Sequence, residues 1–167
     1  METAQSQFHE PAAFAPELSC NEATAQLEGL LSGETDLIAN AANTSAFLNT
    51  ILPRLNWVGF YFLRGDELVL GPFQGNPACV RIPVGRGVCG TCVATGVTQR
   101  VADVHSFPGH IACDLRSRSE LVVPVRHGDS LVAVLDIDSP VRDRFSSEDE
   151  EFVESLVHTF ERCQFGG

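Results

Sequence analysis

Three of the six cysteines stand where a strand, a helix and a loop are expected to meet. Cys79 begins an alternating apolar segment, Cys89 lies at the start of a short helical pattern, and Cys113 lies in a polar loop. The positive end of a helix dipole favours the thiolate, which is the reactive form of cysteine, and a loop exposes its side chains. The spacing therefore predicts thiol chemistry, with Cys113 the most accessible thiol. The alternative is that each is an inert, packed side chain.

Three carboxyl groups could supply protons to such chemistry. Asp136 and Asp138 alternate on one expected strand, so their side chains share a face, and Glu120 precedes the neighbouring strand. Crowded carboxylates raise one another's proton affinity, which can keep one of them neutral and able to donate a proton at cellular pH. The alternative is that Asp136 and Asp138 are ordinary polar residues at a strand end.

Two features could hold a small ligand. Gly85 and Gly87 form a turn before the short helix, and such a turn leaves backbone N–H groups free for an anion such as a carboxylate. Trp57 and Tyr61 are four residues apart on an expected strand, so they share a face and either bracket an apolar group or fill the core. The candidate binding residues are Trp57, Tyr61, Gly85, Arg86, Gly87 and Val88.

A zinc site is the competing interpretation of the same region. Cys89 and Cys92 form a C-x-x-C, and His105, His110 and Cys113 follow, which gives enough donors for tetrahedral zinc. Their spacing is not one of the common zinc patterns, and loop histidines more often form hydrogen bonds. No bound metal is therefore predicted.

The elements that position these residues are read from hydrophobic periodicity and capping signals. Ser19 with Glu22 and Ser147 with Glu150 fit capping boxes at the starts of the first and last helices. The expected elements are helices 19–33 and 37–52, a hairpin of strands 57–63 and 67–70, a strand 79–84, a short helix 88–94, a strand 98–101, a polar loop 103–120, a second hairpin of strands 121–125 and 131–138, and a closing helix 147–160. This order predicts an α+β fold, a mainly antiparallel sheet with N- and C-terminal helices packed on one face.

Composition limits the class of protein. The chain has 167 residues, 44% of them hydrophobic, which suits one domain over 17–167 after a flexible segment 1–16. A formal charge of −11 repels nucleic acid and anionic lipid. No signal peptide or membrane span is visible, so a cytoplasmic location is expected, where thiols stay reduced. Cys20 and Cys163 lie on helical patterns and are expected to pack as small apolar residues.

Several ordered motifs closely resemble the free methionine-R-sulfoxide reductases, whose fold is a GAF domain. These motifs span residues 57–62, 71–75, 78–83, 85–90, 101–105, 109–114, 119–120 and 135–140. The resemblance implies that Cys113 is the attacking nucleophile, that Cys79 resolves the intermediate, and that Cys89 can join the disulfide exchange. The cysteines that are extra to the family pattern are Cys20, Cys92 and Cys163.

The resemblance also implies a reaction. Attack on a sulfoxide needs its oxygen protonated, and Glu120, Asp136 and Asp138 match the acidic site of the family. The expected activity is reduction of free L-methionine-R-sulfoxide to L-methionine by a homodimer without a bound cofactor. Thioredoxin is the expected external reductant. The second hypothesis is a GAF module that senses a small ligand without turnover.

Overall fold

The computed structural model describes residues 18–109 and 114–166, and its centre is one antiparallel sheet. The strands lie in the order β3-β2-β1-β6-β5-β4. Their bounds are β1 Trp57–Arg64, β2 Glu67–Gly75, β3 Arg81–Pro83, β4 Gln99–Val101, β5 Ser119–His127 and β6 Ser130–Ser139. The helices are α1 Cys20–Leu31, α2 Leu37–Ile51, α3 Gly87–Thr95 and α4 Ser147–Phe165, with a short 3₁₀ turn η1 Val104–Ser106.

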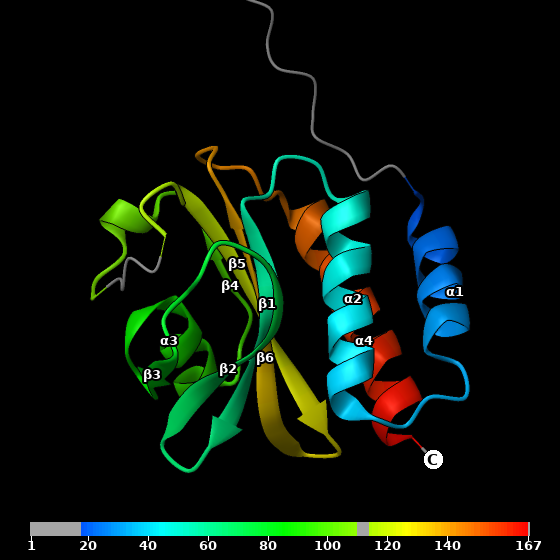
Figure 1. Cartoon of the computed structure of the whole chain (residues 1–167). Coiled ribbons are helices and arrows are strands. Elements are labelled where there is room, and N and C mark those ends of the chain that lie inside the picture. Colours follow the sequence, from blue (N-terminus) through cyan, green and yellow to red (C-terminus); the bar gives the residue numbers. More distant parts are fainter. Residues whose placement is uncertain (1–17, 110–113, 167) are drawn as a thin grey trace, which may run out of the picture.

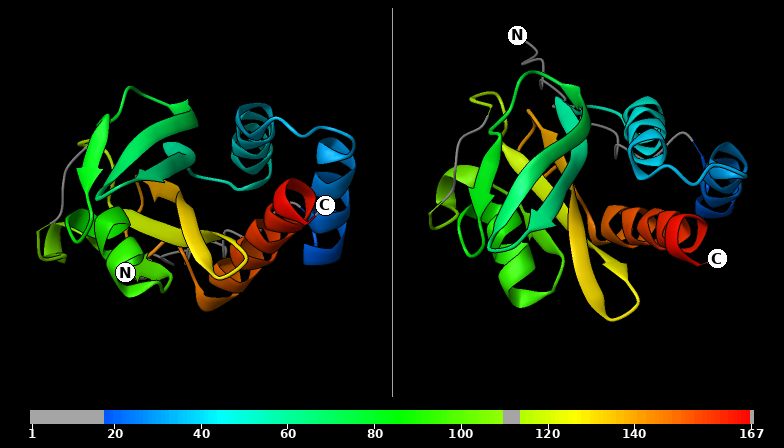
Figure 2. Two further views of the ribbon diagram at one scale, coloured as in Figure 1. Left: turned by 90° about the horizontal axis from the view of Figure 1, so that it is seen from below. Right: turned by 60° about the horizontal axis from the view of Figure 1, so that its bottom comes forward.

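The helices are divided between the two faces of the sheet. Figure 1 shows α1, α2 and α4 on one face and α3 on the other, and both views of Figure 2 keep this arrangement. The predicted α+β fold with the terminal helices on one face is therefore confirmed. No helix in the described part of the chain is long and apolar enough to cross a membrane.

Strand β1 shows why its sequence is apolar at nearly every position. Side chains alternate between the two faces of a strand, and here both faces are covered. Val58 and Phe60 pack in the core beneath the terminal helices. Trp57 and Tyr61 pack in a second, smaller core beneath α3. The site residues on β1 therefore belong to the α3 face of the sheet.

The predicted N-terminal cap is confirmed for the first helix, α1, and is wrong for the last helix, α4. The capping box of Ser19 and Glu22 is confirmed for α1. For α4 the prediction of Ser147 is wrong by one residue, because Ser146 is the cap and pairs with Asp149. Asp149 also accepts a hydrogen bond of 2.9 Å from the buried Arg144, and this ion pair favours the Ser146 register.

The edge of the sheet near the cysteines differs from the prediction. Strand β2 continues to Gly75, five residues past the predicted end, and pairs with β1 around an irregularity between Gly59 and Tyr61. Strand β3 contains only three residues, so Cys79 precedes the strand that it was expected to start. An edge strand has a pairing partner on one side only, and a short one exposes few unpaired backbone groups.

Helix α3 approaches the preceding turn unusually closely. A side-chain carbon at Gly90 would lie 2.4 Å from the carbonyl oxygen of Pro83, so only glycine fits there. The amide of Gly85 donates a 2.8 Å hydrogen bond to the carbonyl of Gly90. Gly96 ends the helix in the left-handed conformation, as predicted. This packing fixes the start of α3, where Cys89 lies, against the sheet.

Candidate functional site

Strand register brings the three predicted carboxyl groups together. Glu120 on β5 lies directly opposite Asp138 on β6, and Asp136 lies two positions before Asp138 on the same strand. Residues opposite each other in an antiparallel pair share a face, as do residues two apart on one strand. All three side chains therefore belong to the face that α3 covers.

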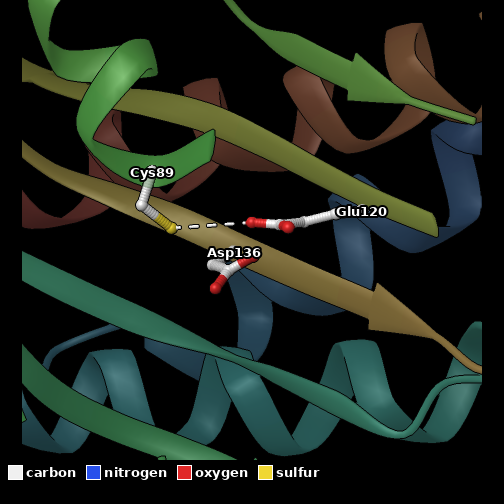
Figure 3. Close-up of side chains that lie close together, drawn as sticks. All are labelled: Cys89, Glu120 and Asp136. Atoms are coloured by element: carbon white, nitrogen blue, oxygen red, sulfur yellow. Dashed lines mark hydrogen bonds between the residues drawn. The ribbon is translucent and has the colours of Figure 1, made fainter. Parts of the chain in front are cut away.

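Cys89 on α3 completes this acidic cluster. Its Sγ lies 3.9 Å from Oε1 of Glu120, and Figure 3 shows Cys89 pointing toward Glu120 and Asp136 from the helix above the sheet. One polar atom from each of Cys89, Glu120 and Asp136 lies within 4.8 Å of the other two. We call Cys89, Glu120, Asp136 and Asp138 the acid cluster.

Burial dominates the electrostatics of the acid cluster. Glu120 and Asp136 are each only 6% exposed, and Asp138 is half-buried. Desolvation, together with the charges of Asp136 and Asp138, raises the pKa of Glu120 well above its usual value. Desolvation and Asp136 likewise raise the pKa of Asp138 well above its usual value. Burial raises the pKa of Asp136 to about 6, although hydrogen bonds from Cys89 and Glu120 oppose the shift. Proton affinity in the cluster is therefore raised, most of all at Glu120 and Asp138, which suits these two groups to donate a proton.

The predicted activation of Cys89 by the helix dipole is wrong. Cys89 is buried and free of any disulfide. Desolvation, followed by the charges of Asp136 and Glu120, raises the pKa of its thiol well above the usual value. Loss of water and two adjacent carboxyls outweigh the dipole of a nine-residue helix. In the form described here, Cys89 is a protonated thiol beside carboxyls.

Cys79 lies beside this face and is disulfide-bonded. It is half-buried, and its carbonyl oxygen accepts a 2.9 Å hydrogen bond from the hydroxyl of Tyr61. This bond ties the segment that carries Cys79 to strand β1. Cys113, the predicted nucleophile, lies outside the described residues.

The three extra cysteines are free thiols. Cys20 and Cys163 pack against the core of the terminal helices, as expected. Cys92 is fully buried, and its Sγ lies 3.7 Å from the carbonyl oxygen of Val122. Burial raises the pKa of Cys92 to about 12, so this thiol is poorly suited to disulfide exchange.

Trp57 and Tyr61 form an apolar wall next to the acid cluster. They are 2% and 1% exposed, and their ring centroids lie 5.7 Å apart in a stacked arrangement. Phe73 extends the stack at 5.2 Å from Trp57, and the sequence analysis missed it because β2 was ended at residue 70. The indole nitrogen of Trp57 donates to the carbonyl of Asn76, which fixes the ring.

The turn before α3 offers fewer free amides than its sequence suggests. The amide of Gly85 donates to Gly90, and the amide of Arg86 donates to Pro83 at 3.1 Å. Both are therefore occupied within the protein. Helical geometry leaves the amides of Gly87 and Val88 without an intrahelical acceptor, so these two remain as candidate anion donors.

The donors of the zinc hypothesis are not gathered among residues 18–109 and 114–166. Cys89 faces Glu120, Cys92 faces a backbone carbonyl, and Nδ1 of His105 lies 3.1 Å from Asp103. His110, like Cys113, lies outside the described residues. The group of possible metal ligands in the described part of the chain is Cys89, Glu120 and Asp136, which is a different set from the one that the zinc hypothesis named.

Comparison with known proteins agrees with the fold. The GAF domain family matches residues 26–163. A free methionine-R-sulfoxide reductase of Escherichia coli is 56% identical over 133 residues, which cover 80% of this chain and 81% of the relative. The structure of fRMsr of Staphylococcus aureus in the reduced form has a TM-score of 0.85 and 50% identity, covering 89% of this chain and 96% of that one. A free methionine-R-sulfoxide reductase from Neisseria meningitidis, solved in complex with its substrate, has a TM-score of 0.83 and 42% identity, covering 90% and 95%.

The fold and the site together define the class of this protein: it is a GAF domain with a buried thiol and carboxyl cluster on its α3 face. Within that class, this chain belongs to the free methionine-R-sulfoxide reductases of the GAF domain family. Of the predicted site residues, the structure gathers Cys89, Glu120 and Asp136 most closely. The sequence analysis did not single out Asn56, Asp114 or Ser117, which lie close to Asp138.

Proposed function

We propose that this chain reduces free L-methionine-R-sulfoxide to L-methionine with its cysteine thiols. The observation that carries the proposal is the acid cluster, in which Glu120 and Asp136 are buried beside a thiol, the pKa of Glu120 is raised well above its usual value and that of Asp136 is raised to about 6. Sulfoxide reduction requires an acid, because the oxygen cannot leave sulfur unprotonated. The relatives named for this reaction are consistent with it.

In the first step the thiolate of Cys113 attacks the sulfoxide sulfur. Glu120 or Asp138 protonates the sulfoxide oxygen, which gives an intermediate with a bond between Sγ of Cys113 and the substrate sulfur. The hydroxyl then passes from the substrate sulfur to Sγ, the sulfur–sulfur and sulfur–oxygen bonds to the substrate sulfur break, and methionine departs. The oxygen and its proton remain on Cys113 as a sulfenic acid. The substrate is thereby reduced by two electrons, and the sulfur of Cys113 is oxidised by two.

In the second step Cys79 condenses with this sulfenic acid. A disulfide forms and water is released. The hydrogen bond from Tyr61 to the carbonyl of Cys79 supports this role, since it fixes the Cys79 segment beside the site. An external dithiol, which we assign to thioredoxin in the cytoplasm, reopens the disulfide by thiol exchange. No bound cofactor is required, and we retain the homodimer as part of the proposal.

The site should prefer the free amino acid. Carboxyl groups of the acid cluster can pair with the ammonium of the substrate, the amides of Gly87 and Val88 can pair with its carboxylate, and Trp57 and Tyr61 can contact its methyl end. A peptide-bound residue carries neither free charge, which would leave polar site groups buried without partners.

The proposal is tested by measuring methionine formation by the purified protein with a dithiol. We expect the free R-sulfoxide to be reduced about a hundredfold more efficiently than the N-acetylated R-sulfoxide, because a missing charged partner costs a few kcal/mol. The free S-sulfoxide should also react poorly, because attack and protonation come from fixed directions. Ligand binding without methionine formation would favour the sensing module instead, and equal efficiency on both R-sulfoxides would contradict the binding scheme.

Cys79→Ser should separate the two steps. Thioredoxin-driven turnover should be lost, whereas a single-turnover experiment should still release one methionine per chain, because attack precedes resolution. Rapid quenching with quantification of methionine measures this release. Cys163→Ser is the matched control, since Cys163 is a half-buried free thiol on α4 and should leave both activities unchanged. Failure of Cys79→Ser to release the first methionine would reverse the assignment of Cys79 and Cys113.

A further inference from the structure

Asn56, the residue before β1, joins two segments that meet near Asp138. Its amide N–H donates a 3.0 Å hydrogen bond to the carbonyl of Asp138 at the end of β6. Its side-chain Nδ2 donates to Oδ2 of Asp114 at 3.2 Å and to Oγ of Ser117 at 3.0 Å. One asparagine therefore fixes the segment before β5 against the strand that carries a proposed proton donor.

Asp114 is held as a fixed negative charge. Its side chain is 11% exposed and accepts hydrogen bonds from the backbone N–H of Arg116 at 2.9 Å and from Nη2 of Arg116 at 2.8 Å. These bonds, with the one from Asn56, lower the pKa of Asp114 to about 2. Asp114 is therefore ionised throughout the pH range in which the protein would work.

Ser117 lies in the same segment and hydrogen-bonds to Asp138. This bond lowers the pKa of Asp138, whereas the charge of Asp114 raises it. The serine is 4% exposed, and its Oγ accepts the hydrogen bond of Asn56, which leaves the hydroxyl hydrogen for Asp138. A donor to a carboxylate stabilises the ionised form, whereas a negative neighbour stabilises the protonated form. Asp114 and Ser117 thus oppose each other at one carboxyl group.

We propose that Asp114 and Ser117, held side by side by Asn56, are positioning residues that set how firmly Asp138 retains its proton. This inference rests on the proposed function, in which Asp138 is a candidate proton donor. The other titratable groups that face Asp138 are Asp136 on β6, Glu120 on β5, Cys89 on α3 and Tyr61 on β1. They are the same in every variant below, so a difference between variants reports the segment 114–117.

The test compares the pH dependence of the first methionine release in single turnover. An acid must be protonated to act, so the rate falls as pH rises through its pKa. This fall is the alkaline limb of the pH profile. Asp114→Asn removes a negative charge and should move this alkaline limb to lower pH. Ser117→Ala removes a donor to the carboxylate and should move it to higher pH. Each shift should be on the order of one pH unit.

Two further variants control for structural disruption of the segment 114–117. Arg116→Gln removes an exposed cation that offsets the charge of Asp114, so it should move the limb to higher pH without disturbing the core. Asp103→Asn is the matched control, because Asp103 also accepts the backbone N–H two residues on and pairs with an arginine. It faces His105 and Arg142 instead of Asp138, and its profile should equal that of the unmodified protein.

The carboxyl resonance of Asp138, followed by ¹³C NMR during a pH titration, gives a readout that does not require activity. Its midpoint should fall in Asp114→Asn and rise in both Ser117→Ala and Arg116→Gln. Opposite shifts in a protein that forms no methionine would sustain this inference and contradict the proposed function. Shifts in one common direction, or none, would overturn the inference even if the protein reduces the sulfoxide.

Discussion

Cys113→Ser should abolish methionine formation, even when dithiothreitol replaces thioredoxin. A serine hydroxyl is not ionised at neutral pH and cannot take up the sulfoxide oxygen, so no sulfenic acid forms and the reaction stops before its first step. Both steady-state turnover and the single-turnover release of methionine should fall to the level of a blank without protein. This is the largest effect that we expect from one substitution.

The control for this experiment is Cys20→Ser, because Cys20 is a free thiol on α1 that packs against the terminal helices. That variant should retain full activity. A sulfenic acid trap such as dimedone should label Cys113 in Cys79→Ser after one turnover, and it should label nothing in Cys113→Ser. Methionine release by Cys113→Ser at the normal rate would transfer the nucleophilic role to Cys79 or Cys89.

Glu120→Gln should slow the first chemical step by about 10²–10⁴-fold, the usual cost of a lost general acid. Glutamine keeps the shape and the hydrogen-bonding reach of glutamate but carries no acidic proton. Glu120 is suited to donate one because burial and the neighbouring aspartates raise its pKa well above the usual value. For the unmodified protein, the rate should therefore fall as pH rises through the raised pKa of the cluster.

Rapid quenching separates this effect from binding. We expect the single-turnover rate constant to fall while the substrate concentration at half saturation changes little. Glu28→Gln is the control, since Glu28 is exposed on α1 and its ion pair with Arg162 is long, at 3.9 Å. A loss of affinity with an unchanged rate constant would make Glu120 a binding residue for the substrate ammonium.

The acid cluster depends on a layered fold with both sheet faces covered. The terminal helices bury one face, which leaves α3 to exclude water from the other. Exclusion of water helps a carboxyl group to retain its proton, because solvation favours the charged form. Cys89 is the residue of α3 in contact with Glu120, so its buried thiol forms part of the cover over this carboxyl group.

The sequence alone predicts features that depend on local pattern. Ser19 and Glu22 identify the start of α1, alternation places Asp136 and Asp138 on one face, and Gly96 marks the end of α3. These follow from backbone geometry within a few residues, which neighbouring elements do not change. The choice of Ser147 over Ser146 failed because a buried ion pair between Arg144 and Asp149 selected the cap.

Only the tertiary structure decides how residues distant in the chain act on one another. A register shift between Val125 and Arg126 in the β5–β6 hairpin sets Glu120 opposite Asp138, and the turn residues alone do not predict this shift. Burial reverses the thiolate character predicted for Cys89, because desolvation depends on what packs above the helix start. Asn56 lies 58 residues from Asp114, so its hydrogen bond to that carboxylate is invisible in the sequence. Periodicity and caps reflect the short-range geometry of one chain segment, whereas proton affinity depends on the water and charges that folding removes or brings near.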